Sequence, residues 1–272
     1  MKGKRAILLV SFGSSYKETR EKTLEPIGAQ VREAYPQYPV YRAWTSRIIR
    51  KKMLERDGED IPDVAQALEQ MRADGISEVT VQPTILLKAI EYEGILTDLK
   101  AQREFFTTIR VGEPLLSSVS DGERIVRILA ENLPLGEQDC LVLVGHGTEH
   151  PANAIYGSLN RSLRDKGISN IHIGTIEAAP TCEDVLEEVR RSGSRRIVLT
   201  PLLMVAGEHA HNDLDGADAD SWKSRFLAAG FEVDCVVKGL GEYPGVRQIV
   251  LEHLKKAVSG SDGEGSFTEI CR

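Results

Sequence analysis

Long hydrophobic runs and aromatic residues are scarce in this 272-residue sequence. No stretch approaches the ~18 consecutive apolar residues of a transmembrane helix. The run Ala6–Val10 follows a basic start, but it is too short for the core of a signal peptide. We therefore predict a cytoplasmic protein with no membrane partner. Because only 6% of the residues are aromatic, Val, Ile, Leu and Ala must build most of its core.

The cysteines do not form a metal or redox motif. They are Cys140, Cys182, Cys235 and Cys271, and no two of them have the CxxC spacing. This spacing argues against a thiolate zinc site and against a thioredoxin-like motif. Four thiols without such a pattern fit a reducing compartment.

Basic charge is in deficit, with 34 Lys and Arg against 41 Asp and Glu and a net charge of −7. An acidic chain is a poor nonspecific binder of nucleic acid, so we predict no nucleic-acid partner. Nucleotide motifs of the GxxxxGK(S/T) and GxGxxG types are absent, and so is the GxSxG elbow of α/β-hydrolases. Val144 and Gly145 stand where RHG-type phosphohistidine enzymes have a cation, which argues against phosphoryl transfer at His146.

Short apolar segments alternate with amphipathic stretches of helical period along the whole chain. The predicted strands are 6–10, 39–44, 79–87, 109–111, 140–144, 171–176, 197–205 and 233–237. Strands that alternate with helices are typical of parallel sheets with helices on both faces. The fold class that we predict is therefore α/β, with two similar Rossmann-like domains and an active-site cleft between them.

An internal repeat carries the prediction of two domains. Residues 8–14 resemble residues 142–148, and residues 81–87 resemble residues 199–205. We expect an N-terminal domain over 1–134 and a C-terminal domain over 135–258, with the last helix, 243–258, able to pack back on the first domain. The Ser-, Gly- and Asp-rich tail, 259–272, is expected to be disordered.

Histidine and glutamate side chains follow several predicted strands. His146 lies in VGHGT, Glu177 follows IHIGTI, and His209 and His211 lie in GEHAHND. Ligands bind beyond the carboxyl ends of strands in open parallel sheets, so we expect these groups on one rim. Imidazole and carboxylate together suit a divalent first-row metal. Glu177 has an alternative interpretation as a partner of the helix start at Pro180.

The repeat also aligns two acidic residues with this rim. Counted from the aligned prolines, Glu91 corresponds to His209 and Glu93 to His211. One rim would then carry imidazoles and the other carboxylates. The alternative is that Glu91 and Glu93 begin an exposed helix, where acidic side chains favour the helix dipole.

An ordered set of motifs resembles the anaerobic sirohydrochlorin cobaltochelatases, which are class II tetrapyrrole chelatases related in fold to protoporphyrin ferrochelatase. The matches run from about Ala6 to about Leu254. They are SFGSSY (11–16), RAWTS (42–46), ERDG (55–58), EYE (91–93), PLLSS (114–118), GHGT (145–148), VAGEHAHND (205–213), DSWK (220–223) and GLGE (239–242). GHG alone is a weak signal, but the ordered set is specific.

The resemblance implies a two-domain chelatase fold and the insertion of Co²⁺ into sirohydrochlorin, an early step of oxygen-independent cobalamin biosynthesis. It implies that His146, Glu177 and His209 hold the metal and that His146 is catalytic. Cobalt is then a substrate, and no permanently bound cofactor is expected. Ile85 stands where some members have a histidine, which puts a haem-binding role in doubt. His211 is an additional imidazole that could alter metal preference, and we count it with Glu91 and Glu93 among the candidate substrate-binding residues.

Metal insertion must remove two pyrrole N–H protons, and a neutral His146 can accept one near neutral pH. Sirohydrochlorin carries eight carboxylates, so an acidic chain needs local cations to bind it. Arg50 and Lys88 are our candidates, together with Arg47, Lys51 and Lys52. The alternative for residues 50–52 is a solvated helix face.

Two other functions stay open beside cobalt insertion. One is an iron (Fe²⁺) or nickel (Ni²⁺) chelatase acting on the same tetrapyrrole, because imidazole and carboxylate accept all three metals. The other is a noncatalytic carrier of tetrapyrrole or metal. The partners that we predict are sirohydrochlorin and a divalent metal ion, and a homo-oligomer is left open.

Overall fold

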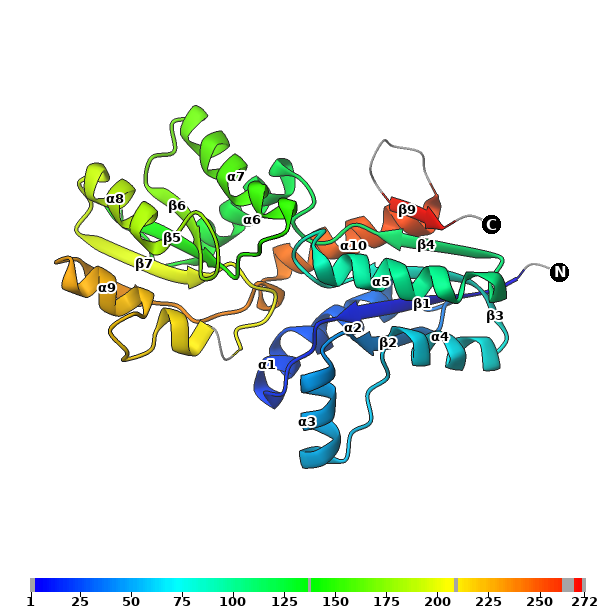
Figure 1. Ribbon diagram of the computed structural model, residues 1–272. Helices are drawn as coiled ribbons and strands as arrows, with labels where there is room; N and C mark the ends of the chain where they lie inside the picture. Colours follow the sequence, from blue (N-terminus) through cyan, green and yellow to red (C-terminus); the bar gives the residue numbers. More distant parts are fainter. Residues whose placement is uncertain (1–2, 137, 208–209, 261–266, 271–272) are drawn as a thin grey trace. The chain divides into compact units, whose positions relative to one another are not determined.

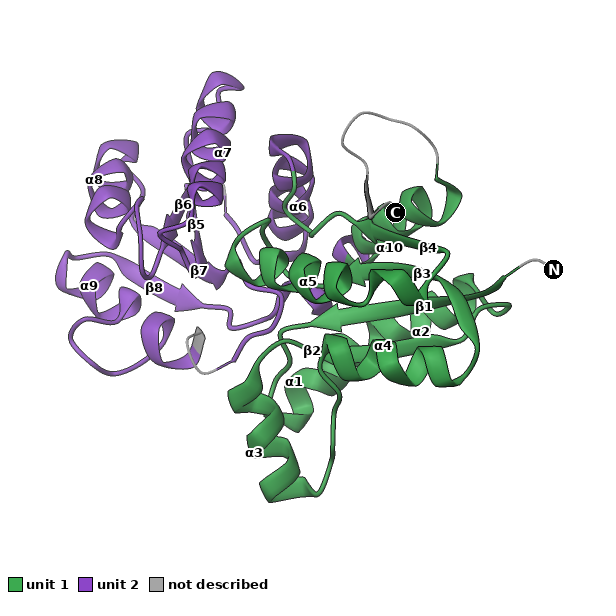
Figure 2. Ribbon diagram, turned by 45° about the vertical axis from the view of Figure 1, so that its right-hand side comes forward, with its two compact units in different colours: residues 1–117, 247–272 green, residues 118–246 purple. Residues whose placement is uncertain are grey.

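The structure is a computed structural model, which describes residues 3–136, 138–207, 210–260 and 267–270. It divides into two compact units (Figure 2). Unit 1 comprises residues 1–117 and 247–272, and unit 2 comprises residues 118–246. None of the described helices is both long enough and apolar enough to cross a bilayer.

The sheet of unit 1 contains five strands in the order β2-β1-β3-β4-β9 (Figure 1). They are β2 (Val40–Trp44), β1 (Lys4–Ser11), β3 (Ile76–Pro83), β4 (Thr108–Gly112) and β9 (Phe267–Ile270). The first four strands are parallel, and β9 runs antiparallel to β4. The carboxyl ends of β1 to β4 therefore lie at one edge of the sheet.

Helices cover both faces of this sheet because β1 is apolar on both sides. Leu8 and Val10 pack with α4 (Val64–Ala73) and α5 (Ile90–Ala101). Ile7 and Leu9 point to the other face and pack with α2 (Leu24–Ala34) and α10 (Pro244–Ser259). The remaining helical elements of unit 1 are α1 (Lys17–Lys22), α3 (Arg47–Asp57) and the 3₁₀ turn η1 (Arg103–Phe105).

The sheet of unit 2 has four parallel strands in the order β6-β5-β7-β8. They are β6 (Ile171–Thr175), β5 (Cys140–Gly145), β7 (Arg196–Pro201) and β8 (Glu232–Cys235). In both units, the first strand along the chain lies between the second and the third, and the fourth lies beyond the third. This shared strand order confirms the prediction, made from the internal repeat, of two similar α/β units.

The core of unit 2 lies between this sheet and its helices. Alternate residues of β5 and β7 pack with α8 (Cys182–Ser192) and α9 (Trp222–Ala228). Helix α7 (Ala154–Asp165) lies along β6, where the amide of Asn160 exchanges two hydrogen bonds, of 2.7 and 2.9 Å, with the backbone of Ile173. Short helical segments are η2 (Pro151–Asn153), η3 (Ala210–Leu214) and η4 (Leu240–Glu242).

All eight predicted parallel strands are present, but two of them end earlier than their apolar runs. Within the apolar runs 79–87 and 197–205, strand β3 ends at Pro83 and strand β7 ends at Pro201. These residues occupy matching places, since Pro83 pairs with Val10 and Pro201 with Val144. Proline has no N–H to donate to a ladder, so the apolar residues that follow it form loops instead.

The division between the units differs from the expected boundary at residue 134. Helix α6 (Val119–Asn132) belongs to unit 2, because it packs on α7 and its Glu123 binds Ser162 and Lys166. The tail also differs from the expected disorder over 259–272, since residues 267–270 form β9. Antiparallel pairing with β4 gives hydrogen-bond partners to the backbone of a strand that would otherwise form a sheet edge.

Candidate functional site

The loop that follows β5 turns sharply at Gly147. Its φ is +85°, and a Cβ there would lie 2.8 Å from Thr175 Oγ1 and 2.9 Å from the Ala178 nitrogen. Only glycine adopts this conformation without strain and fits this space. The turn begins directly after β5 and holds His146 at the carboxyl edge of the unit 2 sheet.

Backbone pairing between β5 and β6 continues past the ends of both strands and brings Glu177 to His146. The Ile176 N–H donates to the Gly145 carbonyl at 3.0 Å, and the Glu177 N–H donates to the His146 carbonyl at 2.8 Å. As a result, Glu177 Oε2 lies 3.3 Å from His146 Nδ1. Both side chains are accessible, with exposed fractions of 41% for His146 and 56% for Glu177.

Asn153 holds together the two loops that carry this pair. Its Oδ1 accepts from the Thr148 N–H at 3.1 Å, and its Nδ2 donates to the Ala179 carbonyl at 2.7 Å. His150 is also occupied locally, because its Nδ1 accepts from the Ala152 N–H at 3.1 Å and so caps η2. No motif in the sequence singles out Asn153, because its role is to join two loops that meet only in the folded chain.

The contacts of His146 favour one tautomer of its imidazole. Nδ1 lies 3.2 Å from the Gly147 carbonyl and 3.3 Å from Glu177 Oε2, which are both acceptors. A proton on Nδ1 satisfies them and leaves the lone pair on Nε2. Metal-bound histidines commonly have this arrangement, in which one ring nitrogen binds a carboxylate or carbonyl and the other binds the metal.

The third predicted metal ligand, His209, lies outside the described residues. His211 is the second residue of η3, and its side chain is exposed. Over the described ranges, no group of three His, Cys, Asp or Glu side chains could hold a metal. The structure thus brings together two of the three predicted ligands, His146 and Glu177.

Thiol ligands are disfavoured in unit 2. Burial raises the pKa of Cys140 to about 12 and the pKa of Cys182 to about 11. Both cysteines lie in the core among the side chains of α8 and the sheet. A protonated thiol is a poor metal ligand, so a cation near His146 would be held by nitrogen and oxygen donors.

The carboxyl edge of the unit 1 sheet carries the other candidate residues. Glu91 and Glu93 lie in the first turn of α5, and both are exposed, as the helix-start alternative expects. Lys88 precedes this helix and forms an ion pair with Glu113, which directly follows β4. Arg50 is a member of α3 and donates to the Ile61 carbonyl at 2.7 Å and to the carboxylate of Asp63, the N-cap of α4, at 2.9 Å.

Glu113 is a buried carboxylate that no motif in the sequence marks. It is only 4% exposed, and its backbone carbonyl accepts from Gln82 Nε2 at 2.9 Å. His253 Nδ1 lies 3.2 Å from the same carbonyl. A half-exposed Lys88 is therefore fixed by a rigid partner, because both the side chain and the backbone of Glu113 are engaged.

A sequence profile of the family described as "Cobalt chelatase (CbiK)" matches residues 5–259. The chain belongs to this family. The sirohydrochlorin cobaltochelatase of Salmonella typhimurium is 35% identical over 257 residues, which cover 94% of this chain and 97% of that protein. The sirohydrochlorin cobaltochelatase CbiKC of Nitratidesulfovibrio vulgaris is 37% identical over 263 residues, covering 95% of this chain and 92% of that protein. The family resemblance stated from the motifs is confirmed.

The fold of this CbiK family member is also similar to the folds of other chelatases whose structures have been solved. SirB from Bacillus subtilis with Fe³⁺ has a TM-score of 0.67 at 15% identity and covers 96% of this chain and 98% of that one. CbiX, described as the terminal enzyme for biosynthesis of siroheme in denitrifying bacteria, has a TM-score of 0.53 at 19% identity, with 93% and 99% coverage. The chelatase fold that the sequence predicts is therefore confirmed.

Proposed function

We propose that this protein is a sirohydrochlorin cobaltochelatase, which inserts Co²⁺ into sirohydrochlorin in anaerobic cobalamin biosynthesis. The observation that carries the proposal is the contact of 3.3 Å between His146 Nδ1 and Glu177 Oε2 at the carboxyl edge of a parallel sheet. Relatives that match this chain over more than nine-tenths of its length are named for that activity.

Each protein group has a defined task in this reaction. The macrocycle loses two protons from pyrrole nitrogens and gains one divalent cation, so the charge of its core is unchanged. His146 Nε2 can ligate the incoming metal, because the Nδ1 proton is held by its acceptors. Once the metal has passed to the macrocycle, Nε2 can accept one of the two pyrrole protons, and the other passes to water. Glu177 then stabilises the imidazolium that forms. His209, as the resemblance implies, is the third ligand.

The reaction is followed by the absorbance change of sirohydrochlorin on addition of Co²⁺, with the uncatalysed rate subtracted. We expect His146→Ala to slow insertion by roughly 100-fold or more, because it removes both a ligand and a proton acceptor. His150→Ala is the matched control, since it changes an imidazole four residues away whose Nδ1 caps η2. Insertion by His146→Ala at the rate of the wild-type protein would exclude the proposed role.

Iron or nickel insertion is the alternative that the donor set leaves open. A sirohydrochlorin ferrochelatase of Priestia megaterium is 25% identical over 218 residues, covering 74% of this chain and 76% of that protein. Imidazole and carboxylate bind Fe²⁺, Co²⁺ and Ni²⁺, so rates for the three ions must be compared at equal free concentration. Fastest insertion of Co²⁺ supports the proposal, and binding of sirohydrochlorin without any acceleration would indicate a carrier instead. The cytoplasmic location and a homo-oligomer stay predictions.

A further inference from the structure

Unit 1 contains a cavity of about 240 Å³ between helix α2 and the first two strands of its sheet. One wall is the face of β1 and β2 that α2 covers, where Leu9 pairs with Arg42 and Ser11 pairs with Trp44. The other wall is α2 itself. Protein interiors contain few voids larger than a water molecule, so the chain leaves open a space that side chains normally fill.

A glycine within α2 helps to create this space. Gly28 is buried and lines the cavity, although glycine is an unfavourable residue in a helix interior. The three atoms nearest to a Cβ at this position all belong to the guanidinium group of Arg32, beginning with Nη1 at 3.3 Å. The guanidinium therefore lies over the glycine, one turn along the helix, and a larger side chain at residue 28 would displace it.

The walls of the cavity are largely apolar. Leu9, Ile27 and Trp44 line it, and each is buried. Two buried hydroxyl groups also line it, but Ser11 Oγ and Thr84 Oγ1 are hydrogen-bonded to each other at 2.7 Å. An apolar group can therefore enter the cavity without depriving a buried polar atom of its partner.

Charged side chains stand where the cavity meets solvent. Arg42 Nη1 lies 3.2 Å from Glu25 Oε1, and these side chains are 56% and 51% exposed. Arg32 is also exposed, and it forms no ion pair within the part of the chain that the structure describes. Two cations beside one carboxylate leave an excess positive charge at the mouth. In a chain whose net charge is −7, this local excess selects an anionic ligand.

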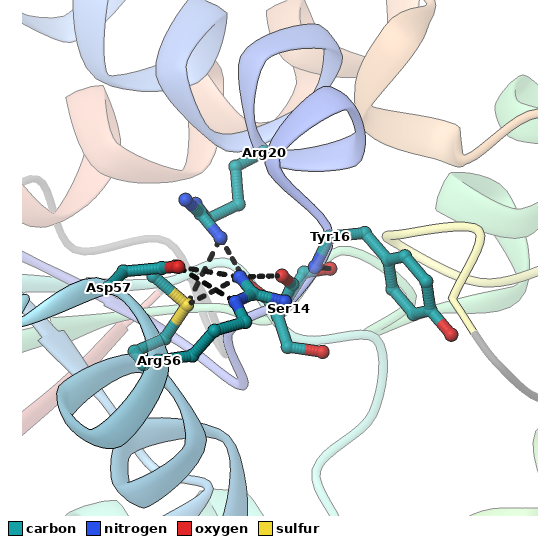
Figure 3. A network of polar contacts seen from close by, with 7 residues as sticks. Ser14, Tyr16, Arg20, Arg56 and Asp57 are labelled. Carbon is teal, nitrogen blue, oxygen red and sulfur yellow. Dashed lines mark hydrogen bonds and ion pairs between the residues drawn. The ribbon is translucent and has the colours of Figure 1, made fainter.

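The segment between β1 and α2 is fixed by arginines of α1 and α3 (Figure 3). Arg20 Nη1 donates to the Ser14 carbonyl at 3.1 Å, and Arg56 Nη2 donates to the Ser15 carbonyl at 2.7 Å. Arg56 also forms an ion pair with Asp57 at 2.6 Å. Because this segment connects the two walls of the cavity, the cavity is pre-formed, as small-molecule sites usually are.

We propose that this cavity is a binding site for a small aromatic monocarboxylate, whose ring lies against Trp44, Leu9 and Ile27 and whose carboxylate pairs with Arg32. An apolar cavity of about 150 Å³ binds benzene, so about 240 Å³ has room for about ten non-hydrogen atoms. A tetrapyrrole with eight carboxylates is far larger. The site is therefore separate from the proposed metal insertion, and the inference does not rest on that function.

The test is a calorimetric titration of the full-length protein with phenylacetate, which has this size and charge. The neutral 2-phenylacetamide is the matched ligand, because it has the same shape without the charge. We expect phenylacetate to bind with a Kd below about 1 mM and the amide to bind about fivefold or more weakly, since only the acid forms a charge-assisted hydrogen bond. In a Trp222→Phe background, Trp44 fluorescence reports directly on the cavity wall.

Filling the cavity should abolish this binding. Gly28→Leu should raise the Kd for phenylacetate about tenfold or more, because the leucine side chain occupies the space of the ring. Gly94→Leu is the matched control, since Gly94 is an exposed glycine of α5 and a Cβ there would meet nothing within 4 Å. Leucine is the better helix former, and thermal unfolding of both variants shows whether the fold is kept. Gly28→Ala should raise the Kd by a smaller factor.

Removing the cation tests the choice of an anion. Arg32→Met should raise the Kd for phenylacetate to that for the amide, while the Kd for the amide stays within about twofold of wild type. Arg72→Met should change neither value, because Arg72 is an exposed residue of α4, which covers the opposite face of the sheet.

The outcomes separate this site from the proposed reaction. Absence of phenylacetate binding up to about 10 mM overturns the inference, and so does an equal Kd for the acid and the amide. Displacement of phenylacetate by metal-free sirohydrochlorin would show that the cavity belongs to the substrate site, which also overturns it. Failure of the wild-type protein to insert cobalt removes the proposed function but leaves these titrations as they are.

Discussion

The two units differ in chemistry at positions where their backbones agree. Gly13 follows β1 with φ of +99°, and Gly147 follows β5 with φ of +85°. Immediately before these glycines stand Phe12 in unit 1 and His146 in unit 2. In both units the carbonyl of that residue accepts from the segment after the neighbouring strand, from the N–H of Ser46 in one and of Glu177 in the other.

This comparison shows what the repeated fold supplies and what it leaves to individual side chains. The backbone places one side chain after the first strand of each unit beside one after the second. Unit 1 has phenylalanine and serine at these two places, and the Ser46 hydroxyl caps helix α3 by accepting from the Ile49 N–H. Unit 2 has histidine and glutamate there, and in the proposed function the histidine binds the metal while the glutamate orients it. Function therefore depends on the residues grafted on a common frame.

The largest expected effect comes from making unit 2 resemble unit 1 at one of these places. Glu177→Ser should lower cobalt insertion by about 10- to 100-fold, because the carboxylate that orients His146 is lost. Rates with saturating sirohydrochlorin measure it, and Glu187→Ser on the exposed face of α8 is the control. Adding Ser46→Glu in unit 1 to the Glu177→Ser variant should not restore its rate of cobalt insertion. An insertion rate within twofold of wild type for Glu177→Ser would contradict the proposed role of Glu177 in orienting His146.

Substitution of the glycine in the turn after β1 or after β5 should have a smaller effect, which is a loss of stability. Gly147→Ala should lower the free energy of unfolding by about 2–3 kcal/mol, from left-handed backbone strain and contact with the backbone at Ala178. Gly13→Ala should have a similar effect, since its Cβ would lie 2.7 Å from the Trp44 ring. Denaturant titrations measure both changes.

Matched controls isolate the contribution of the close contacts. Gly75 in unit 1 and Gly193 in unit 2 each have φ of +77°, and a Cβ at either would meet nothing within 4 Å. Their alanine variants should lose only about 1 kcal/mol, the cost of the backbone conformation. Equal losses at all four glycines would show that the two turns are no tighter than ordinary helix ends.

The smallest expected effect concerns the pH dependence of unit 2. Burial lowers the pKa of His172, although its contact with Glu188 at 3.0 Å partly opposes the shift. The unfolded chain therefore binds this proton first as the pH falls below about 6.5. The contribution of neutral His172 to the stability of unit 2 should be fully present above that pH and decrease below it, and His172→Gln should reduce this dependence.

The two tryptophans report the units separately in that measurement. Trp222 is buried in the core of unit 2, and Trp44 is buried in unit 1. In a Trp44→Phe background, fluorescence follows unit 2 alone during unfolding at pH 7.5 and at pH 5.5. His211→Gln, which changes an exposed imidazole, should leave the pH dependence as it was.

The candidate site was predictable where local pattern and strand topology decide the position of a side chain. Apolar runs located the eight parallel strands, and the rule that ligands lie beyond strand ends located His146 and Glu177. The contact between His146 and Glu177 depends on the β5–β6 hydrogen bonds that continue into the loops after both strands. The sequence does not show that these hydrogen bonds form. Arg50 shows the opposite case, because a cation that looked available is bonded to the Ile61 carbonyl and to Asp63.

By itself, the sequence determined the strands, their repeat and the histidine and glutamate at the strand ends, because these follow from short-range periodicity and chain order. Only the tertiary structure decided that Glu113 is buried under Lys88, that α6 belongs to unit 2, and that Arg20 and Arg56 hold a loop. The physical reason is that burial and choice of partner depend on residues distant in sequence. The same residue type can be solvated, paired or buried according to what the fold packs against it.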